Sequence, residues 1–276
     1  MPGTNDIIVE LKAIAKRILP ARLSAEISAY RWWRYLIEQN ARSGNVELTK
    51  RLIDRCGNSV LAGPFKGLTY PVDILLSHCS THNLLGTYEA ELHPWLERIL
   101  GNRYNCAMVI GCGEGYYAVG IALRAGIHVG AYDTCVTVRR DCRRMAEANR
   151  VSNLVRVHSW CGAAEIGRLH GMRCLVFSDC EGYEQNLFTR QTVSSLTHSD
   201  LLIELHDHGM PPGSMRGLLE ARLRETHRVE IVVSRVRRVI DFPHLSHLDP
   251  VDAQRAIDEG ARGITQEWML ATSRHF

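Results

Sequence analysis

The sequence predicts an α/β fold with a seven-stranded, mostly parallel sheet, helices on both of its faces and a helical N-terminal extension. Short apolar runs typical of buried strands alternate with amphipathic helical segments, and the runs lie at 106–110, 127–132, 154–158, 174–178, 200–206, 228–234 and 267–273. The last two are expected to close the sheet as an antiparallel pair. A glycine-rich loop directly follows the first run, as in nucleotide-binding α/β sheets.

Residues 1–60 are predicted to form a helical cap from segments 5–19, 24–39 and 45–56. The second segment carries aromatic side chains beside arginines. Two interpretations remain open. The cap packs on the main domain or on a twin subunit, which would make a homo-oligomer, or its basic, aromatic surface meets a membrane or an acidic acceptor.

Residues 61–100 are expected to connect the cap to the main domain. Two glycines, two prolines and two aromatic residues in 62–71 indicate a hairpin or bulged strand pair. Segment 84–100 has one apolar helical face, with Pro94 marking a break or a fresh helix start. An element just before the first strand can cover a ligand pocket, so Tyr88 and His93 are candidate acceptor contacts. The alternative is a packed helix with a polar outer face.

The stretch 105–133 is the clearest pattern in the chain. Cys106–Ile110 forms the strand, and the glycine loop after it runs from Gly111 to Gly115. Glycines at alternate positions let the backbone turn sharply and let a ligand approach it closely. A helix begins at once, and the next strand ends in Asp133. An acid at this position can accept hydrogen bonds from two ribose hydroxyls, so the unit predicts nucleotide binding.

The spacing of the loop identifies the nucleotide. A dinucleotide fingerprint would need a third glycine where Tyr116 stands. The G-x-G-x-G pattern instead resembles motif I of class I S-adenosylmethionine (SAM) methyltransferases. This resemblance implies a Rossmann-like methyltransferase domain over 101–276, with SAM as cofactor and Asp133 at its ribose. The residues it implies for the cofactor are Gly111, Cys112, Gly113, Glu114, Gly115, Tyr116, Asp133, Trp160, Cys161 and Asp179.

Polar side chains follow the fourth and fifth predicted strands. Asp179, Glu181 and Gly182 come after the fourth strand, while Glu204, His206 and His208 end the fifth. In the fold that the chain resembles, these two strands are neighbours, so both tails should meet beside the SAM methyl group. Burying several charges together is costly without partners or a function.

The same segments are similar to those of one methyltransferase family. Residues 177–184 resemble the D-x-E-G-x-E segment of FkbM-type methyltransferases, and 202–206 resemble the E-x-H of that family. Those enzymes methylate hydroxyls on sugars, polyketides and related small molecules. The resemblance covers roughly 86–205 and implies O-methylation of a small-molecule or carbohydrate-like acceptor. The acid that the family has at the end of strand one is missing, and Glu114 is the candidate to replace it.

Two mechanisms are compatible with these residues. In one, His206 is the general base and a nearby acid orients it, with Asp179 and Glu204 as the other candidate catalytic residues. In the other, Asp179, His206 and His208 hold a divalent metal that lowers the pKa of the acceptor hydroxyl. Glu181 and His208 are further candidate acceptor contacts, and the alternative for His208 is a solvated loop histidine.

Composition limits the remaining possibilities. The formal net charge is +3, and residues 61–276 have no basic face, which argues against nucleic acid as a partner. No apolar run has the length of a transmembrane span. The nine cysteines form no C-x-x-C pair, which suits reduced thiols in the cytoplasm. The alternatives to a small-molecule enzyme are a protein or RNA methyltransferase and a SAM-fold scaffold without activity.

Overall fold

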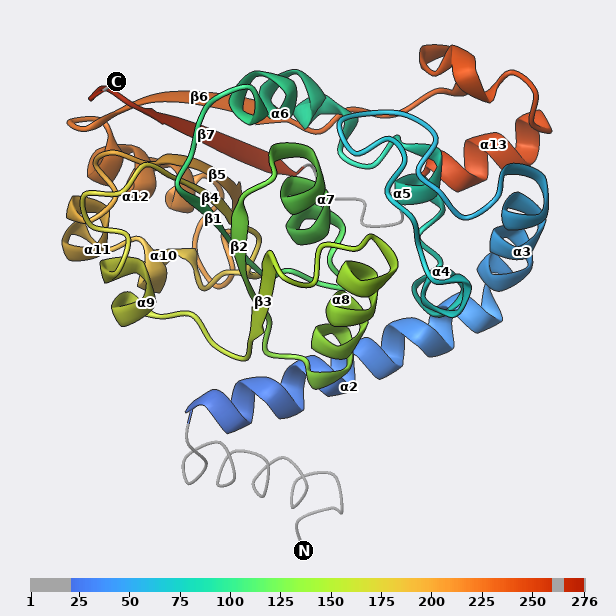
Figure 1. Cartoon of the computed structure of the whole chain (residues 1–276), viewed down its shortest axis with the longest axis horizontal. Coiled ribbons are helices and arrows are strands. Elements are labelled where there is room, and N and C mark those ends of the chain that lie inside the picture. The colour runs from blue at the N-terminus through green and yellow to red at the C-terminus, as the bar shows by residue number, and fades with distance from the viewer. Residues whose placement is uncertain (1–20, 260–265, 276) are drawn as a thin grey trace, which may run out of the picture.

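The fold is built on a seven-stranded sheet, seen in a computed structural model that describes residues 21–259 and 266–275 (Figure 1). The strand order is β3-β2-β1-β4-β5-β7-β6. The strands are β1 (Cys106–Ile110), β2 (His128–Tyr132), β3 (Val155–His158), β4 (Cys174–Ser178), β5 (Asp200–Leu205), β6 (His227–Val233) and β7 (Glu267–Ser273). Strands β1 to β5 are parallel, and β7 is antiparallel to both β5 and β6. The predicted sheet is confirmed, including the antiparallel closing pair.

The two faces of the sheet bury separate apolar clusters, because successive side chains of a strand point to opposite faces. Val109 of β1 and Phe177 of β4 belong to one cluster, while Ile110 and Val176 belong to the other. Helices α6 (His93–Leu100), α7 (Tyr116–Ala125), α8 (Val136–Ala148) and α13 (Pro250–Ile257) contribute to the first cluster. The second is covered by α9 (Ala163–Gly167), α10 (Glu184–Leu187), α11 (Arg190–Ser194) and α12 (Ser214–Leu223), on the left of Figure 1.

The N-terminal helices pack on the first of these faces and along its lower edge in Figure 1. Helix α2 (Ala21–Arg42) is the longest and contacts α8, α4 (Val72–His78) and α3 (Asn45–Cys56). Leu48 and Leu52 of α3 are buried in the same apolar cluster as the strands. The helices predicted at 24–39 and 45–56 are therefore present, whereas segment 5–19 lies outside the described residues. The boundaries 1–60, 61–100 and 101–276 remain predictions.

The connecting segment differs from its prediction. Instead of a strand pair over 62–71, one antiparallel bridge between Ser59 and Thr69 closes a turn, since Gly63 and Gly67 take positive φ angles that bend the chain. The predicted helix 84–100 is divided. Short elements α5 (Thr81–Leu85) and η1 (Ala90–Leu92) precede α6, whose first turn contains Pro94.

Two further short helices, η2 (Val239–Asp241) and η3 (Pro243–Leu245), lie between β6 and α13. No helix among the described residues is long and apolar enough to cross a membrane.

Candidate functional site

A cavity of about 560 Å³ opens at the carboxyl ends of the parallel strands. The loops after β1, β2, β3 and β4 form its floor and sides, and one face of α2 forms its outer wall. The order of the strands reverses between β1 and β4, because the chain first builds outward to β3 and then returns. Ligands of open α/β sheets bind beside such a reversal.

The glycine loop forms the floor of the cavity, and its first residue must be glycine because a side chain there would collide with the segment after β4. Gly111 has a φ of +78°, and a Cβ at this position would lie 1.6 Å from the carbonyl oxygen of Asp179. The N–H groups of Gly111 and Cys112 both donate to the carbonyl of Tyr132, at 2.8 and 2.9 Å. This ties the loop to the end of β2.

Only part of the loop faces the cavity. Gly111, Gly113 and Glu114 line it. Cys112 is buried, and a Cβ on Gly115 would meet Cys142, so these residues point inward. Tyr116 packs edge-on against two aromatic rings in the core. The structure thus divides the predicted loop residues into a group at the cavity and a group beneath it.

Asp133 lies on the floor beside the loop. Its Oδ1 accepts from the N–H of Cys135 at 2.7 Å, and its Oδ2 accepts from the N–H of Gly113 at 3.1 Å. Burial raises the pKa of Asp133 to about 6, although the two hydrogen bonds oppose this change. Each carboxylate oxygen can accept more than one hydrogen bond, so the side chain can still receive hydroxyl donors from a ligand.

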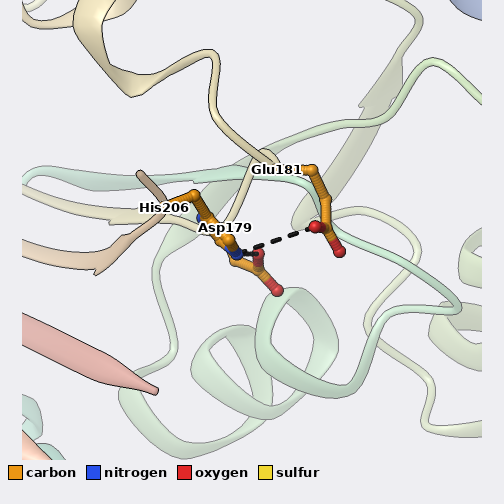
Figure 2. A group of neighbouring side chains, drawn as sticks. All are labelled: Asp179, Glu181 and His206. Carbon is orange, nitrogen blue, oxygen red and sulfur yellow. Dashed lines mark ion pairs between the residues drawn. The ribbon is translucent and has the colours of Figure 1, made fainter. Parts of the chain in front are cut away.

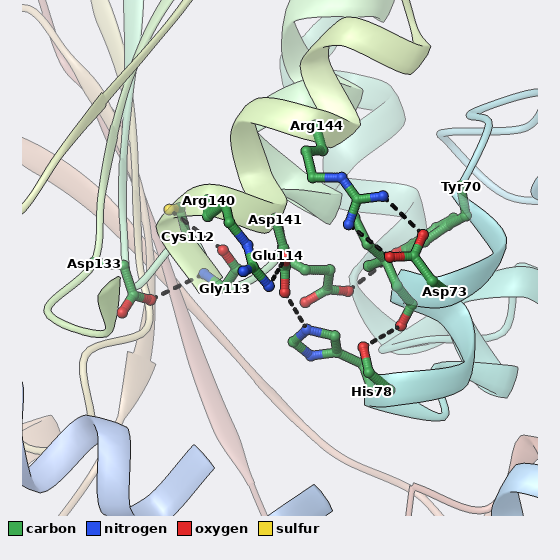
Figure 3. A network of polar contacts seen from close by, with 12 residues as sticks. Tyr70, Asp73, His78, Cys112, Gly113, Glu114, Asp133, Arg140, Asp141 and Arg144 are labelled. Atoms are coloured by element: carbon green, nitrogen blue, oxygen red, sulfur yellow. Dashed lines mark hydrogen bonds and ion pairs between the residues drawn. The ribbon is translucent and has the colours of Figure 1, made fainter. Parts of the chain in front are cut away.

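A polar network behind the loop holds two more groups at the cavity (Figure 3). The hydroxyl of Tyr70 donates to Glu114 at 3.1 Å, and His78 Nε2 lies 3.1 Å from a carboxylate oxygen of Asp141. Burial lowers the pKa of His78, but the bond to Asp141 and nearby carboxylates outweigh it, so the pKa is raised. The sequence analysis did not select His78, because nothing in the sequence shows that α4 ends at this cavity.

The third side of the cavity carries two of the residues that the resemblance implied for the cofactor. Trp160 and Cys161, after β3, both line it. The guanidinium carbon of Arg22 from α2 lies 5.7 Å from the centroid of the Trp160 ring. Tyr183 contacts the same ring edge-on, at a centroid distance of 5.3 Å. A flat aromatic surface is therefore held in place at the end of β3.

The tails of β4 and β5 converge as predicted on the imidazole of His206 (Figure 2). Its Nδ1 lies 3.0 Å from Oε1 of Glu184. Its Nε2 lies 3.6 Å from Glu204, 3.7 Å from Glu181 and 3.8 Å from Asp179. Burial lowers the pKa of His206, but the hydrogen bond to Glu184 and the charge of Asp179 outweigh it and raise that pKa.

The tautomer of His206 follows from its partner. A carboxylate only accepts hydrogen bonds, so Nδ1 carries the hydrogen in its bond to Glu184. In the neutral ring the lone pair is therefore on Nε2, the nitrogen that lies near Asp179, Glu181 and Glu204. An imidazole in this state can accept a proton or bind a metal ion at Nε2.

Glu184, like His78, is a site residue that was not predicted from the sequence. It is fully buried, and its Oε1 accepts from the N–H of Cys180 at 3.2 Å as well as from His206. Its Oε2 has no hydrogen-bond partner among the described residues. The sequence did contain a pattern that could have identified it, because Glu184 is the last acid of the D-x-E-G-x-E segment.

A turn returns Glu181 toward His206. Glu181 and Gly182 have φ angles of 54° and 96°, both in the left-handed region. Among the described residues, Asp179, Glu181 and His206 form a group whose potential ligand atoms lie within 4.8 Å of one another. His208 is exposed and packs over Gly182, so it stands apart from this group.

The remaining predicted residues have other surroundings. Glu204 is buried, and its Oε1 accepts from the side-chain amide of Gln266 at 2.9 Å. Tyr88 packs against two tyrosine rings of α7, and His93 Nε2 lies 3.0 Å from the carbonyl oxygen of Tyr88. Neither Tyr88 nor His93 lines the cavity. Their predicted contact with an acceptor stays a prediction.

Comparisons with known proteins concern the fold. No protein-family model matches the sequence, and a search of curated proteins finds no match. The resemblance to FkbM-type enzymes is therefore not confirmed. The chain has a Rossmann-like methyltransferase fold. That assignment rests on the strand order and on the antiparallel β7.

Similar solved structures include methyltransferases of several kinds. One is described as human methyltransferase 10 domain containing protein, with 14% identity, a TM-score of 0.46 and coverage of 84% of this chain and 97% of that chain. Another is geranyl diphosphate C-methyltransferase from Streptomyces coelicolor A3(2), with 16% identity, a TM-score of 0.45 and coverage of 83% and 97%. Likenesses this distant carry no information about the reaction or its substrate.

Proposed function

We propose that the chain is a SAM-dependent methyltransferase that methylates a hydroxyl group on a small-molecule or carbohydrate-like acceptor. The observation that carries this proposal is the position of His206. Its Nε2 lies within 4 Å of three carboxylates at the shared end of β4 and β5, and two of them, Asp179 and Glu181, also line the cavity floored by the glycine loop. A proton-accepting or metal-binding group thus stands beside a nucleotide-type pocket.

The cavity fits the parts of SAM. Asp133 offers carboxylate oxygens to the ribose hydroxyls, and Trp160 offers a ring face to the adenine. Glu114 is the carboxylate closest in sequence to the missing acid of strand one, and the Tyr70 hydroxyl holds it at the cavity. When bound, SAM would supply an electrophilic methyl group.

An alcohol is a weak nucleophile at neutral pH, so the acceptor hydroxyl must lose its proton as the methyl group is transferred. In the metal-free mechanism, His206 Nε2 accepts that proton. Glu184 then stabilises the imidazolium through its 3.0 Å hydrogen bond to Nδ1. Because the pKa of His206 is raised, the neutral form that this mechanism needs is favoured by alkaline pH.

The donor set also fits a divalent metal. Asp179, Glu181 and His206 would supply two carboxylates and one imidazole, a combination that suits Mn²⁺, Fe²⁺ or Zn²⁺. Such an ion would lower the pKa of a bound hydroxyl. Glu184 would still hold the His206 ring by Nδ1, as carboxylates commonly do for metal-bound histidines.

The test is release of S-adenosylhomocysteine (SAH) from SAM with a panel of hydroxylated acceptors, measured with the wild type and with His206→Ala. We expect turnover with at least one acceptor and its loss in the variant. Activity that disappears with a chelator and returns with Mn²⁺ or Zn²⁺ would select the metal mechanism. Tight SAM binding without turnover on any small molecule, protein or RNA would favour a scaffold.

A further inference from the structure

Helix α2 forms a wall of the cavity although it lies outside the sheet and its crossover helices. One face of the helix lines the cavity, and the residues on it are Ala25, Ser28, Ala29, Trp32, Trp33 and Leu36. Their spacing of three and four residues places them on a single side of the helix.

The helix is held over the cavity at both of its ends. At one end Arg22 lies over the ring of Trp160, and one turn later Glu26 pairs with Arg139 of α8 at 2.7 Å. At the other end the side-chain amide of Asn40 donates to the carbonyl of His78 at 3.2 Å. These contacts fix α2 across the ends of β2 and β3, the strands that lead into Asp133 and Trp160, and Figure 1 shows α2 in this position.

Part of the wall that α2 forms consists of small side chains, which leave the cavity open. Protein interiors are normally packed closely by bulky apolar side chains. In the half nearer to its anchor at Trp160, α2 instead presents Ala25, Ser28 and Ala29 to the cavity. The bulkier side chains that line the cavity, those of Trp32, Trp33 and Leu36, belong to the half nearer to His78. The small side chains of the first half keep open the space that Asp133 faces.

A buried donor in the same wall lacks a partner. Nε1 of Trp33 is inaccessible to solvent and has no hydrogen-bond partner among the described residues. Nearly all buried N–H groups in native proteins are paired, because leaving one unpaired destabilises the fold. The ring of Trp33 lines the cavity although its Nε1 does not face the open space. A rotation of this ring on ligand binding would bring the Nε1–H to an acceptor atom of the bound molecule.

We propose that α2 is part of the cofactor site. The adenosine half of SAM lies between Asp133 and the small residues of α2, and the Nε1–H of Trp33 donates a hydrogen bond to it. This inference rests on the proposed function. It adds specificity-determining residues from the N-terminal extension, which the nucleotide-binding pattern of the sequence does not include.

The test is calorimetric titration of the full chain with SAH. Trp33→Phe keeps an aromatic ring and removes the N–H, and we expect binding to weaken by about 2- to 13-fold, the net contribution of one neutral hydrogen bond. Ala29→Leu keeps a residue of high helix propensity and fills the part of the cavity next to α2, and we expect at least about tenfold weaker binding of SAH. Ala41→Leu makes the same change on an exposed part of α2 and should bind like the wild type. Circular dichroism confirms that each variant is folded.

The outcomes separate this inference from the proposed function. If the wild type binds SAH and Asp133→Ala weakens binding, but both α2 variants bind normally, the role of α2 is overturned and the methyltransferase proposal stands. If the α2 variants lose turnover but keep SAH affinity, α2 faces the acceptor and our inference is wrong. If the wild type binds neither SAH nor SAM, both proposals fall.

Discussion

Replacement of Glu184 by glutamine should lower the pKa of His206. Glutamine has the same shape, and its Oε1 can still accept from the N–H of Cys180 and from His206, so the change mainly removes a buried charge. A hydrogen bond to a charged group is worth about 1.5–3 kcal/mol and a neutral one about 0.5–1.5 kcal/mol. The difference of roughly 1–1.5 kcal/mol corresponds to about one pH unit.

The matched control is Glu181→Gln. Glu181 lies 3.7 Å from Nε2, but its side chain is 58% exposed, so solvent screens its charge. We expect the Glu181→Gln substitution to lower the pKa of His206 by about a third of a unit or less. The titration is followed by NMR of the imidazole in the presence of a chelator. Equal shifts in the two variants, or no shift in Glu184→Gln, would refute the assignment of Glu184 as the partner that raises this pKa.

The contact between Glu184 and His206 should also make the free energy of unfolding depend on pH. The folded-state pKa of His206 is raised above its unfolded value of about 6.5. The stabilisation of the folded state by protonated His206 is therefore complete below about pH 6.5. It is lost as the pH rises through the folded-state pKa. The loss of unfolding free energy in Glu184→Gln should therefore be larger at pH 5.5 than at pH 9, as measured by urea denaturation.

Three further predictions follow from the site and the extension. Asp133→Ala should weaken SAH binding by about 1.5–3 kcal/mol in calorimetry. The affinity of the wild type for SAH should decrease as the pH is lowered through about 6, because Asp133 becomes protonated, and Asp133→Asn should remove this pH dependence. His206→Ala should keep SAM affinity and lower turnover by roughly two to four orders of magnitude; a variant with parental turnover would leave His206 a structural residue. Deletion of 1–60 should lower the melting temperature, since it removes buried leucines of α3; equal stability with weaker liposome binding would favour the membrane interpretation.

The sheet could be predicted because local sequence determines most of it. Each strand is a short apolar run, and β1, β4 and β7 have the predicted bounds. The meeting of the β4 and β5 tails followed from their adjacency in the resembled fold, which the pairing of Phe177 with Leu202 confirms. Strand ends and the glycine loop are backbone features, and they leave strong patterns in a sequence.

The rest of the site depends on contacts between distant segments, which leave no local pattern. Glu184 looked like one acid among several, and only the fold shows that it is fully buried against His206. The aromatic stripe of α2 was compatible with a core, a subunit interface or a membrane surface. Contacts of Arg22 with Trp160 and of Asn40 with His78 make α2 a wall of the cavity, and the subunit and membrane interpretations stay predictions. Because the loops at the strand ends leave this cavity open on one side, the extension that closes it is the element that can determine which ligands enter.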